Sequence, residues 1–326
     1  MNHTLPIIDI ENIYSDNDFQ LDALAREFFT IYSTYGFGYI VNHGIESSLL
    51  KNLFDQSAKF HALPSKQKME IVLNSLHRGF IPINTSTDRN TPLAKIDKPN
   101  QSESFIIMRE DSKDDTEFRN GSYLAGPNQW PCNLPGFRKI VMEYNNAIRR
   151  LAERLMNIFA RTMETEYESL KISQFSPATT WLRLLRYPTT PAQRADDLFG
   201  SAPHCDFGCI TLLAQDENSG LQVRAPDGQW IDAPPLPNTL VLNVGNMLHR
   251  LSNGKLLSTP HRVINLSGKQ RFSCAFFYDP NVKAIIKPLS SCVDNDNPRQ
   301  FPDDLVFADY LRHELSSSYD THSTKT

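Results

Sequence analysis

WLRLLRY (181–187) opens a series of short apolar runs in the second half of the chain. The others are CITLLAQ (209–215), GLQVRA (220–225), QWIDA (229–233), TLVLNVG (239–245), HRVINL (261–266) and RFSCAFFY (271–278). The runs are rich in β-branched and aromatic residues, and Gly, Pro, Asn and Asp separate them, a pattern typical of strands joined by turns. Because they follow one another too closely for helical crossovers between parallel strands, they predict an antiparallel sandwich or barrel.

The residues before this series carry helical periodicity, with apolar side chains recurring every three or four positions. They are Leu21, Leu24, Phe28 and Ile31 in the first 60 residues, and Ile140, Tyr144, Ile148, Leu151, Leu155 and Ile158 between 136 and 165. The run FGYIV (37–41) is β-rich and is closed by turn-forming residues, so it is expected to be a strand. The predicted fold class is α+β, with N-terminal and central helices flanking a jelly-roll core.

We expect the chain to form one structural unit with three regions. Residues 1–175 are expected to pack on the core, 176–290 to form the jelly roll, and 291–326 to form a C-terminal segment. The last eleven residues, SSSYDTHSTKT (316–326), have too little apolar content to pack and are expected to be frayed. Residues 84–101, NTSTDRNTPLAKIDKPNQ, form a long polar loop, either an active-site lid or a disordered insertion.

Composition excludes several classes of protein. Lysine and arginine number 33 and aspartate and glutamate 37, spread along 326 residues, which gives a formal net charge of -4 and predicts neither a nucleic-acid nor a membrane partner. No stretch approaches about 18 consecutive apolar residues, and the N-terminal residues lack a basic start followed by an apolar run. The five cysteines contain no CxxC pair, which argues against a disulfide framework or a thiolate zinc site. We therefore expect a cytoplasmic protein with a small-molecule substrate and no obligate protein partner.

A candidate metal site lies in the sequence His204-Cys205-Asp206, just before the run CITLLAQ. In an extended chain, residues i and i+2 point to the same face, so one imidazole and one carboxylate converge. His261, at the start of the run HRVINL, can supply a second imidazole. Two histidines and one carboxylate on one face are the arrangement that suits non-haem Fe(II) oxygenases. His249 is a competing candidate, but it has no carboxylate at a suitable spacing and is interpreted as structural.

The order of motifs resembles a known family. HCDFGCITLLAQD, GLQV, LVLNVGNML, SNGKLLSTPHRVIN and RFSCAFFYDPN are similar to segments of the isopenicillin N synthase-like branch of the Fe(II)/2-oxoglutarate dioxygenases. The resemblance extends to LPIIDI, YGFGYIVNHGI, SAKFHALPSKQKM, HRGF and ESFIIMRE in the first half, so it covers most of the chain. It implies a double-stranded β-helix, which is a jelly-roll core, and iron bound by His204, Asp206 and His261.

A second pair of residues begins ten positions after His261. Arg271 and Ser273 are again at i and i+2, so a guanidinium and a hydroxyl can hold one carboxylate. The resemblance assigns that carboxylate to the distal end of 2-oxoglutarate, and it adds Tyr187 as a further contact to this co-substrate. Cys205 and Arg186 depart from residues common in the family, but both are expected to point away from the site.

The resemblance implies a reaction as well as a fold. O2 and 2-oxoglutarate would be consumed at Fe(II), succinate and CO2 released, and a small organic substrate hydroxylated or desaturated. One alternative is an oxidase of the isopenicillin N synthase type, in which the Arg and Ser bind the substrate's own carboxylate. Another alternative, from a different class, is a jelly-roll protein that binds a ligand without catalysis.

Two residues are candidates for contact with the substrate. Alternation along the run 181–187 that points Tyr187 inward also points Arg183 inward, and the parity that places Ser273 inside does the same for Phe277. A buried guanidinium needs a partner, either an internal carboxylate or a polar group of the substrate. The motifs look closest to microbial members such as thymine 7-hydroxylase, which implies a small, flat, nucleobase-like or other heterocyclic substrate.

Overall fold

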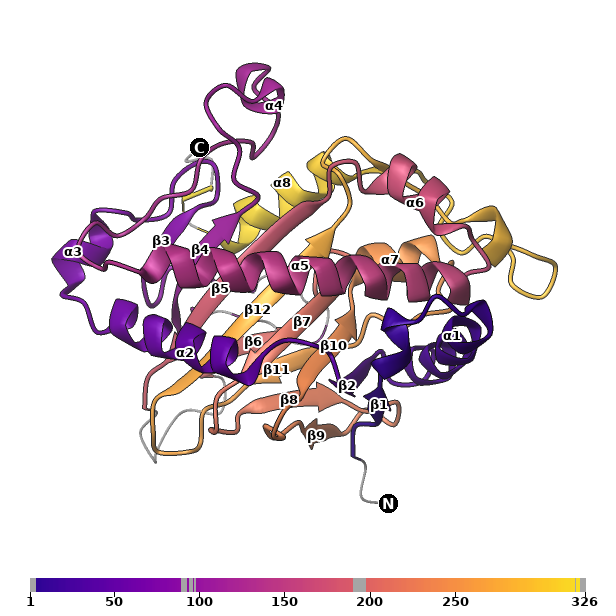
Figure 1. Cartoon of the computed structure of the whole chain (residues 1–326), viewed down its shortest axis with the longest axis horizontal. Helices are drawn as coiled ribbons and strands as arrows, with labels where there is room; N and C mark the ends of the chain where they lie inside the picture. Colours follow the sequence, from indigo (N-terminus) through magenta and orange to yellow (C-terminus); the bar gives the residue numbers. More distant parts are fainter. Residues whose placement is uncertain are drawn as a thin grey trace.

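Two β-sheets form the centre of the computed structural model, which describes residues 4–88, 93, 96, 98–189, 198–319 and 321–322 (Figure 1). Within these residues the major sheet has eight strands in the order β1-β2-β10-β7-β12-β5-β4-β3, and the minor sheet has four in the order β6-β11-β8-β9. Their pairings are antiparallel, apart from the parallel pair β1 and β2. The predicted antiparallel jelly roll is confirmed.

The predicted runs coincide with strands of these sheets. The major sheet consists of β1 (Ile7–Asp9), β2 (Phe37–Val41), β3 (Gly79–Ile81), β4 (Glu103–Met108), β5 (Thr179–Tyr187), β7 (Ile210–Gln215), β10 (Leu240–Val244) and β12 (Arg271–Asp279). The minor sheet consists of β6 (Ser201–His204), β8 (Leu221–Arg224), β9 (Trp230–Asp232) and β11 (His261–Val263), and β13 (Ile285–Ile286) pairs with β14 (Leu305–Val306). Strands from the first 175 residues extend the major sheet at both edges.

Strand β6 is absent from the sequence-based expectations, although it carries His204. Its sequence SAPH contains Pro203 and no β-branched residue, so it has no strand signal of its own. A proline cannot donate to a ladder, but β6 lies at the edge of the minor sheet, where one side of the strand needs no donors. Tertiary pairing with β11 therefore determines this strand.

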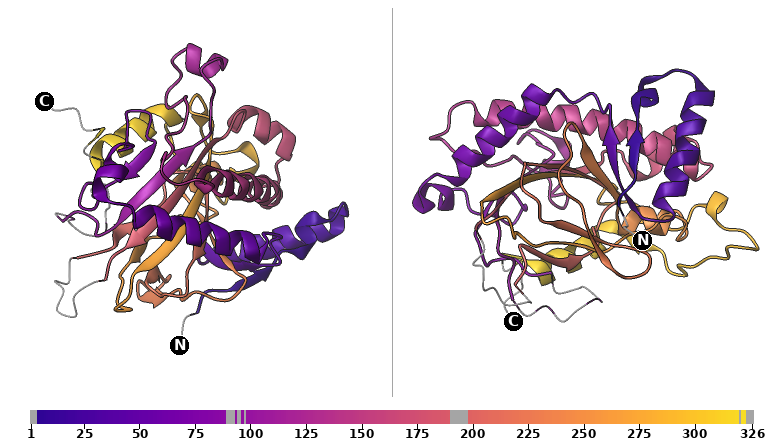
Figure 2. Two further views of the ribbon diagram at one scale, coloured as in Figure 1. Left: turned by 60° about the vertical axis from the view of Figure 1, so that its left-hand side comes forward. Right: turned by 90° about the horizontal axis from the view of Figure 1, so that it is seen from below.

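The helices cover both sides of the sheets. They are α1 (Asp18–Tyr32), α2 (Ser47–His61), α3 (Ser65–Met69), α4 (Thr116–Arg119), α5 (Phe137–Thr162), α6 (Tyr167–Gln174), α7 (Asn246–Leu251) and α8 (Phe307–Ser318), with short 3-10 turns η1 (Glu11–Tyr14) and η2 (Ser290–Cys292). Seen from below in Figure 2, α2 and α5 lie on one side of the strands and α8 on the other. The long central helix predicted between 136 and 165 is confirmed as α5, which buries the predicted stripe of apolar residues.

The major sheet separates two apolar layers because side chains alternate along its strands. On β5 and β12, Leu182, Leu184 and Phe276 pack toward the helices. Tyr187 and Ala275 pack toward the minor sheet. The space between the two sheets therefore receives the residues at positions 183, 185 and 187, as the alternation predicts.

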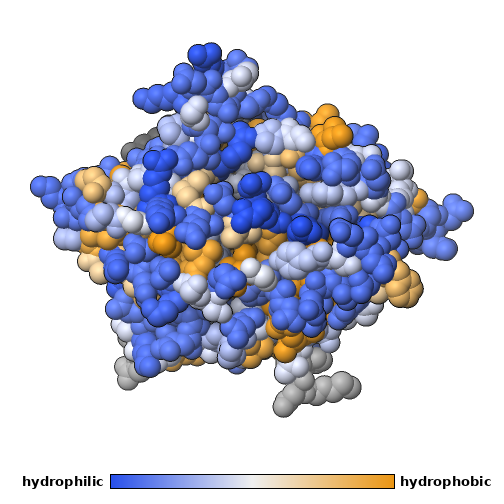
Figure 3. Space-filling view, viewed as in Figure 1, coloured by the Kyte–Doolittle hydropathy of each residue, from blue (hydrophilic) through white to orange (hydrophobic). Residues whose placement is uncertain are grey.

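The outer face over α2 and α5 is mostly hydrophilic, and apolar side chains show mainly between the elements (Figure 3). In the described part of the chain, no helix is long and apolar enough to cross a membrane. Helix α5 reaches 26 residues, but one of its faces is charged. All five cysteines are free, as expected.

The structure corrects the expectation of a frayed end for residues 316–319. Ser316, Ser317 and Ser318 form the last turn of α8, and Tyr319 forms a β-bridge with Ser86. The prediction was wrong because it considered only the low apolar content. Backbone hydrogen bonds and one aromatic ring hold this segment in place. Residues 320 and 323–326 lie outside the described residues. So do 89–92, 94–95 and 97 of the polar loop, and its role as a lid stays a prediction.

Candidate active site

The pairing of β6 with β11 places His204 directly opposite His261. Their ring centroids are 4.3 Å apart. Asp206 follows β6 and directs Oδ1 to both rings, at 3.7 Å from the Nε2 atom of each. One donor atom from each residue lies within 4.8 Å of the other two. The structure thus brings together the three residues predicted to bind a metal.

Backbone carbonyls orient both imidazoles. His204 Nδ1 donates a hydrogen bond to the Ala202 carbonyl at 2.7 Å, and His261 Nδ1 lies 3.3 Å from the Thr259 carbonyl. A carbonyl only accepts, so each Nδ1 carries the proton. Each Nε2 therefore keeps its lone pair, which faces Asp206. This tautomer of histidine can bind a metal through Nε2.

The protonation states of the cluster also suit a cation. Burial, together with the nearby His204, lowers the pKa of His261 to about 4, so this imidazole is neutral at pH 7. Burial on its own would raise the pKa of Asp206, but the two histidines and two hydrogen bonds outweigh it and lower the pKa below the usual value. A neutral imidazole and an ionised carboxylate are the states in which these side chains bind metals.

Two residues that sequence reasoning missed hold the carboxylate in place. Asp206 Oδ2 accepts hydrogen bonds from Thr211 Oγ1 at 2.5 Å and from Asn243 Nδ2 at 2.7 Å. These bonds leave the other oxygen, Oδ1, facing the two histidines. Asn243 gave one sequence signal, because an amide inside the apolar run LVLNV is costly to bury unless it has a partner.

We expect Asn243→Ala to weaken metal binding by about 10- to 100-fold, the usual effect of removing a group that orients a ligand. The Asp206 carboxylate would lose one of its two anchors and rotate more freely. Titration with Co(II), followed by its visible absorption, measures this affinity without any need for turnover. Thr211→Val, which removes the other anchor at nearly constant volume, should act in the same direction. If both variants bind Co(II) as tightly as the parent, the two residues do not orient Asp206 for metal binding.

A cavity between the two sheets runs from the His-Asp-His cluster to Arg271 and Ser273. The Arg271 side chain is fully buried, and its guanidinium lies 4.8 Å from the centroid of the Tyr187 ring. Nε donates to the Asn218 carbonyl and Nη2 to Gln215 Oε1. Nη1 of Arg271 and Oγ of Ser273 are buried without a hydrogen-bond partner among the described residues. The arrangement is a donor pair without an acceptor.

A second cavity adjoins the first at the cluster, and both predicted substrate contacts, Arg183 and Phe277, line the two cavities. Arg183 donates to Ser104 Oγ at 2.9 Å and to the Tyr319 hydroxyl at 3.2 Å, and both partners are neutral. Phe277 contributes an aromatic face, with its ring centroid 6.0 Å from that of Trp181. Counted out to its open mouth, the hollow measures about 540 Å³.

Carboxyl groups are present in this second cavity but do not neutralise Arg183. Asp88 and Asp279 both line it, and neither lies within 4.0 Å of the Arg183 guanidinium. Asp279 is engaged elsewhere, because it accepts hydrogen bonds from Trp181 Nε1 and from the Cys209 amide. Among the described residues, the internal carboxylate considered as a partner for Arg183 is therefore not found.

The other sequence candidates lie outside the cluster. Cys205 directs its thiol to the Ser258 carbonyl and not to the His-Asp-His cluster, although this residue lines the second cavity, and Arg186 points away as expected, to Glu103 at 2.8 Å. His249 donates through Nδ1 to the Leu256 carbonyl, and it lines neither cavity. The structure is consistent with a structural role for His249.

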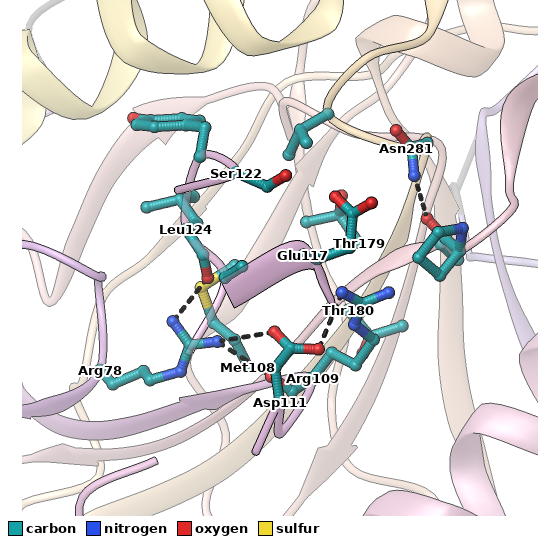
Figure 4. Close-up of a pocket in the computed structure, with 15 residues that line it drawn as sticks. Arg78, Met108, Arg109, Asp111, Glu117, Ser122, Leu124, Thr179, Thr180 and Asn281 are labelled. Carbon is teal, nitrogen blue, oxygen red and sulfur yellow. Dashed lines mark hydrogen bonds and ion pairs between the residues drawn. The ribbon is translucent and has the colours of Figure 1, made fainter. Parts of the chain in front are cut away.

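A third pocket lies at the opposite end of β5 from Tyr187 (Figure 4). Its charged side chains are paired: Arg109 with Asp111 at 2.8 Å, and Glu117 with Lys283 at 2.9 Å. Arg78 donates to carbonyl oxygens of the surrounding chain. With these donors and acceptors satisfied inside the protein, we interpret the pocket as structural.

Comparison with known proteins agrees with this geometry. The profile of the 2OG-Fe(II) oxygenase superfamily matches residues 180–280, and that of the non-haem dioxygenase in morphine synthesis N-terminal family matches residues 5–133. The 2-oxoglutarate-Fe(II) type oxidoreductase hxnY of Emericella nidulans is 34% identical over 96% of this chain and 90% of its own length. The chain belongs to the 2OG-Fe(II) oxygenase superfamily. The resemblance seen in the sequence motifs is confirmed.

Further relatives place the oxygenase among enzymes with small substrates. Homoarginine-6-hydroxylase 2-ODD-C23 of Glycine max is 29% identical, with 97% of each chain covered. A full-length Neurospora crassa protein, crystallised in complex with alpha-KG, superposes with a TM-score of 0.83 and 28% identity over 97% of both chains. The oxygenase is an Fe(II)- and 2-oxoglutarate-dependent dioxygenase of small organic substrates. These findings favour it over the 2-oxoglutarate-independent oxidase and over a non-catalytic binding protein.

Proposed function

We propose that His204, Asp206 and His261 hold the catalytic Fe(II) of this oxygenase. Support comes from the three converging donor atoms, the protonated Nδ1 atoms and the ionised carboxylate. With 2-oxoglutarate, the iron supplies the oxidation: O2 is consumed, 2-oxoglutarate becomes succinate and CO2, and the substrate is hydroxylated or desaturated. The protein itself contributes geometry and a cavity that excludes water.

We further propose that Arg271 and Ser273 bind the distal carboxylate of 2-oxoglutarate and that Tyr187 assists. The observation that carries this assignment is the pair of buried, unpartnered donors, Arg271 Nη1 and Ser273 Oγ. Leaving such donors unpaired costs about 1–3 kcal/mol each, so the cavity calls for an anionic acceptor. Apolar side chains such as Leu185 and Val263 line part of the same cavity.

Arg183 and Phe277 are proposed to bind the substrate. A guanidinium with neutral partners alone still needs an acceptor, and a flat aromatic wall favours a planar molecule. We therefore propose a small planar substrate that presents a carbonyl or carboxylate oxygen to Arg183, with nucleobase-like heterocycles first. The Neurospora crassa protein to which the chain is similar has also been crystallised with thymine.

The five free cysteines support a reducing compartment, and we propose the cytoplasm.

Replacing Arg183 with alanine should raise the KM for the substrate by about 10- to 100-fold, as expected for the loss of a charge-assisted hydrogen bond. Slow, substrate-free conversion of 2-oxoglutarate to succinate should survive, because the hydrogen bonds of Arg183 go to Ser104 and Tyr319 and not to Arg271 or Ser273. Arg224→Ala, on β8, is the matched control. If the KM for the substrate is unchanged, Arg183 does not bind the substrate.

The proposed function is tested by screening small planar metabolites with Fe(II), ascorbate and 2-oxoglutarate. We expect at least one compound to stimulate succinate release, with one succinate formed for each product molecule. Product formation at full rate without 2-oxoglutarate would instead support the oxidase alternative.

A further inference from the structure

The end of the chain folds back onto the cavity that contains Arg183. Tyr319 comes directly after α8, and it lines the same cavity as His204 and Asp206. Its hydroxyl accepts a hydrogen bond from Arg183, whose guanidinium lies 5.9 Å from the centroid of the Tyr319 ring. A residue close to the chain end thus touches the cation proposed to bind the substrate.

A pair of histidines, of which His77 is buried, fixes this end. His322 Nε2 lies 2.9 Å from Nδ1 of His77, whose ring is fully buried. The His77 ring packs edge-on against Tyr319 at 4.9 Å and against Trp181 at 5.2 Å between centroids. Both of these aromatic residues line the cavity, so the histidine pair supports its wall from behind.

Backbone contacts join the same end to the start of the polar loop. The Thr87 amide donates to the Ser318 carbonyl at 2.9 Å, and Ser86 forms a bridge with Tyr319. The next residue, Asp88, also lines the cavity. Two segments far apart in the sequence therefore meet over one opening.

We infer that Tyr319 forms the outer wall of the substrate pocket and is a positioning residue for Arg183, and that Ser318 and His322 hold Tyr319 in place; the three residues together are here called the C-terminal wall. The inference rests on the proposed function, since it takes this cavity as the substrate pocket. It adds a specificity role for residues that lie far from the metal motifs in sequence.

The consequence for binding follows from the hydrogen bonds of Arg183. Without the Tyr319 hydroxyl, Ser104 is the remaining hydrogen-bond partner of the guanidinium among the described residues, and the long side chain gains rotamer freedom. Substrate binding should weaken because that freedom is lost again on binding. Tyr319 does not line the 2-oxoglutarate cavity. Arg183 lines it, but its hydrogen bonds go to Ser104 and Tyr319 and not to Arg271 or Ser273, so the affinity for 2-oxoglutarate should change little.

Carboxypeptidase digestion of the full chain tests whether the wall is docked. We expect digestion of the parent protein to stop near His322, and digestion of His322→Ala to proceed to α8. His313→Ala is the matched control, because His313 is an exposed histidine on α8 itself. Circular dichroism confirms that each variant is folded. Rapid digestion of the parent into α8 would overturn the inference.

Kinetics of Tyr319→Phe test the positioning role. The probe is whichever of thymine, uracil and benzoate most stimulates succinate release by the parent; if none does, the digestion result alone decides. We expect the KM for that probe to rise about fivefold or more, with the KM for 2-oxoglutarate and the substrate-free succinate rate within about twofold of the parent. An unchanged probe KM, or an equal loss of 2-oxoglutarate affinity, would overturn the inference. Failure of the proposed function looks different, since the parent would then form no succinate from 2-oxoglutarate.

Discussion

An Asp206→Ala variant is expected to lose substrate-dependent succinate formation completely while it keeps its fold. Two imidazoles remain, and without the carboxylate they cannot hold Fe(II) tightly or balance its charge. The loss should appear directly as a lower iron content after gel filtration. Folding should survive, because the hydrogen bonds lost by Thr211 and Asn243 cost about 1–3 kcal/mol each, against a typical domain stability of about 5–15 kcal/mol.

Matched controls separate this effect from general damage. His249→Ala removes the histidine that competes for the metal role in the sequence, and Asp232→Ala removes an exposed carboxylate of the minor sheet. Both should retain parent-like iron content and activity per folded molecule. Full activity of Asp206→Ala, measured in parallel with these controls, would contradict the assignment of the iron ligands.

An Arg271→Lys variant is expected to need far more 2-oxoglutarate for the same rate. Lysine keeps the positive charge but loses the forked donor, and it cannot also bond Asn218 and Gln215 in the same geometry. The loss of about 1–3 kcal/mol of binding corresponds to a rise in the KM for 2-oxoglutarate of about 5- to 150-fold. Initial rates of succinate formation over a range of 2-oxoglutarate concentrations measure it.

The adjacent strand supplies the control for this variant. Arg186 lies opposite Phe272 on the pairing of β5 with β12, and its side chain points to the other face, where it pairs with Glu103. Arg186→Lys keeps that ion pair and should leave the KM for 2-oxoglutarate unchanged. If Arg271→Lys and Arg186→Lys have the same KM as the parent, Arg271 does not bind the co-substrate.

Local patterns in the sequence predict those parts of the site that depend on neighbouring residues. His204 and Asp206 converge because they are two positions apart, and the same parity correctly places Arg183 and Phe277 in the space between the sheets. The central helix α5 follows from its apolar stripe alone. Such features need only the geometry of one strand or one helix.

Features that depend on distant pairing were not accessible in this way. The register that sets His204 opposite His261 joins two strands, one of which has no strand signal. Asn243 reaches Asp206 from β10, a contact that no single-strand pattern contains. Tyr319 lies in a run of polar residues, which predicts disorder, yet it packs on Arg183 and His77. In each case the partner is far away in the sequence, so tertiary packing decides the outcome.

Anomalous diffraction at the iron edge tests the central claim most directly. Crystals would be grown without oxygen, with Fe(II) and 2-oxoglutarate, and an anomalous map calculated for the whole molecule. Our account predicts one iron peak at bonding distance from His204 Nε2, Asp206 Oδ1 and His261 Nε2, with the distal carboxylate of 2-oxoglutarate on Arg271 and Ser273. An iron peak elsewhere, or a metal that lacks any of these three ligands, would contradict it.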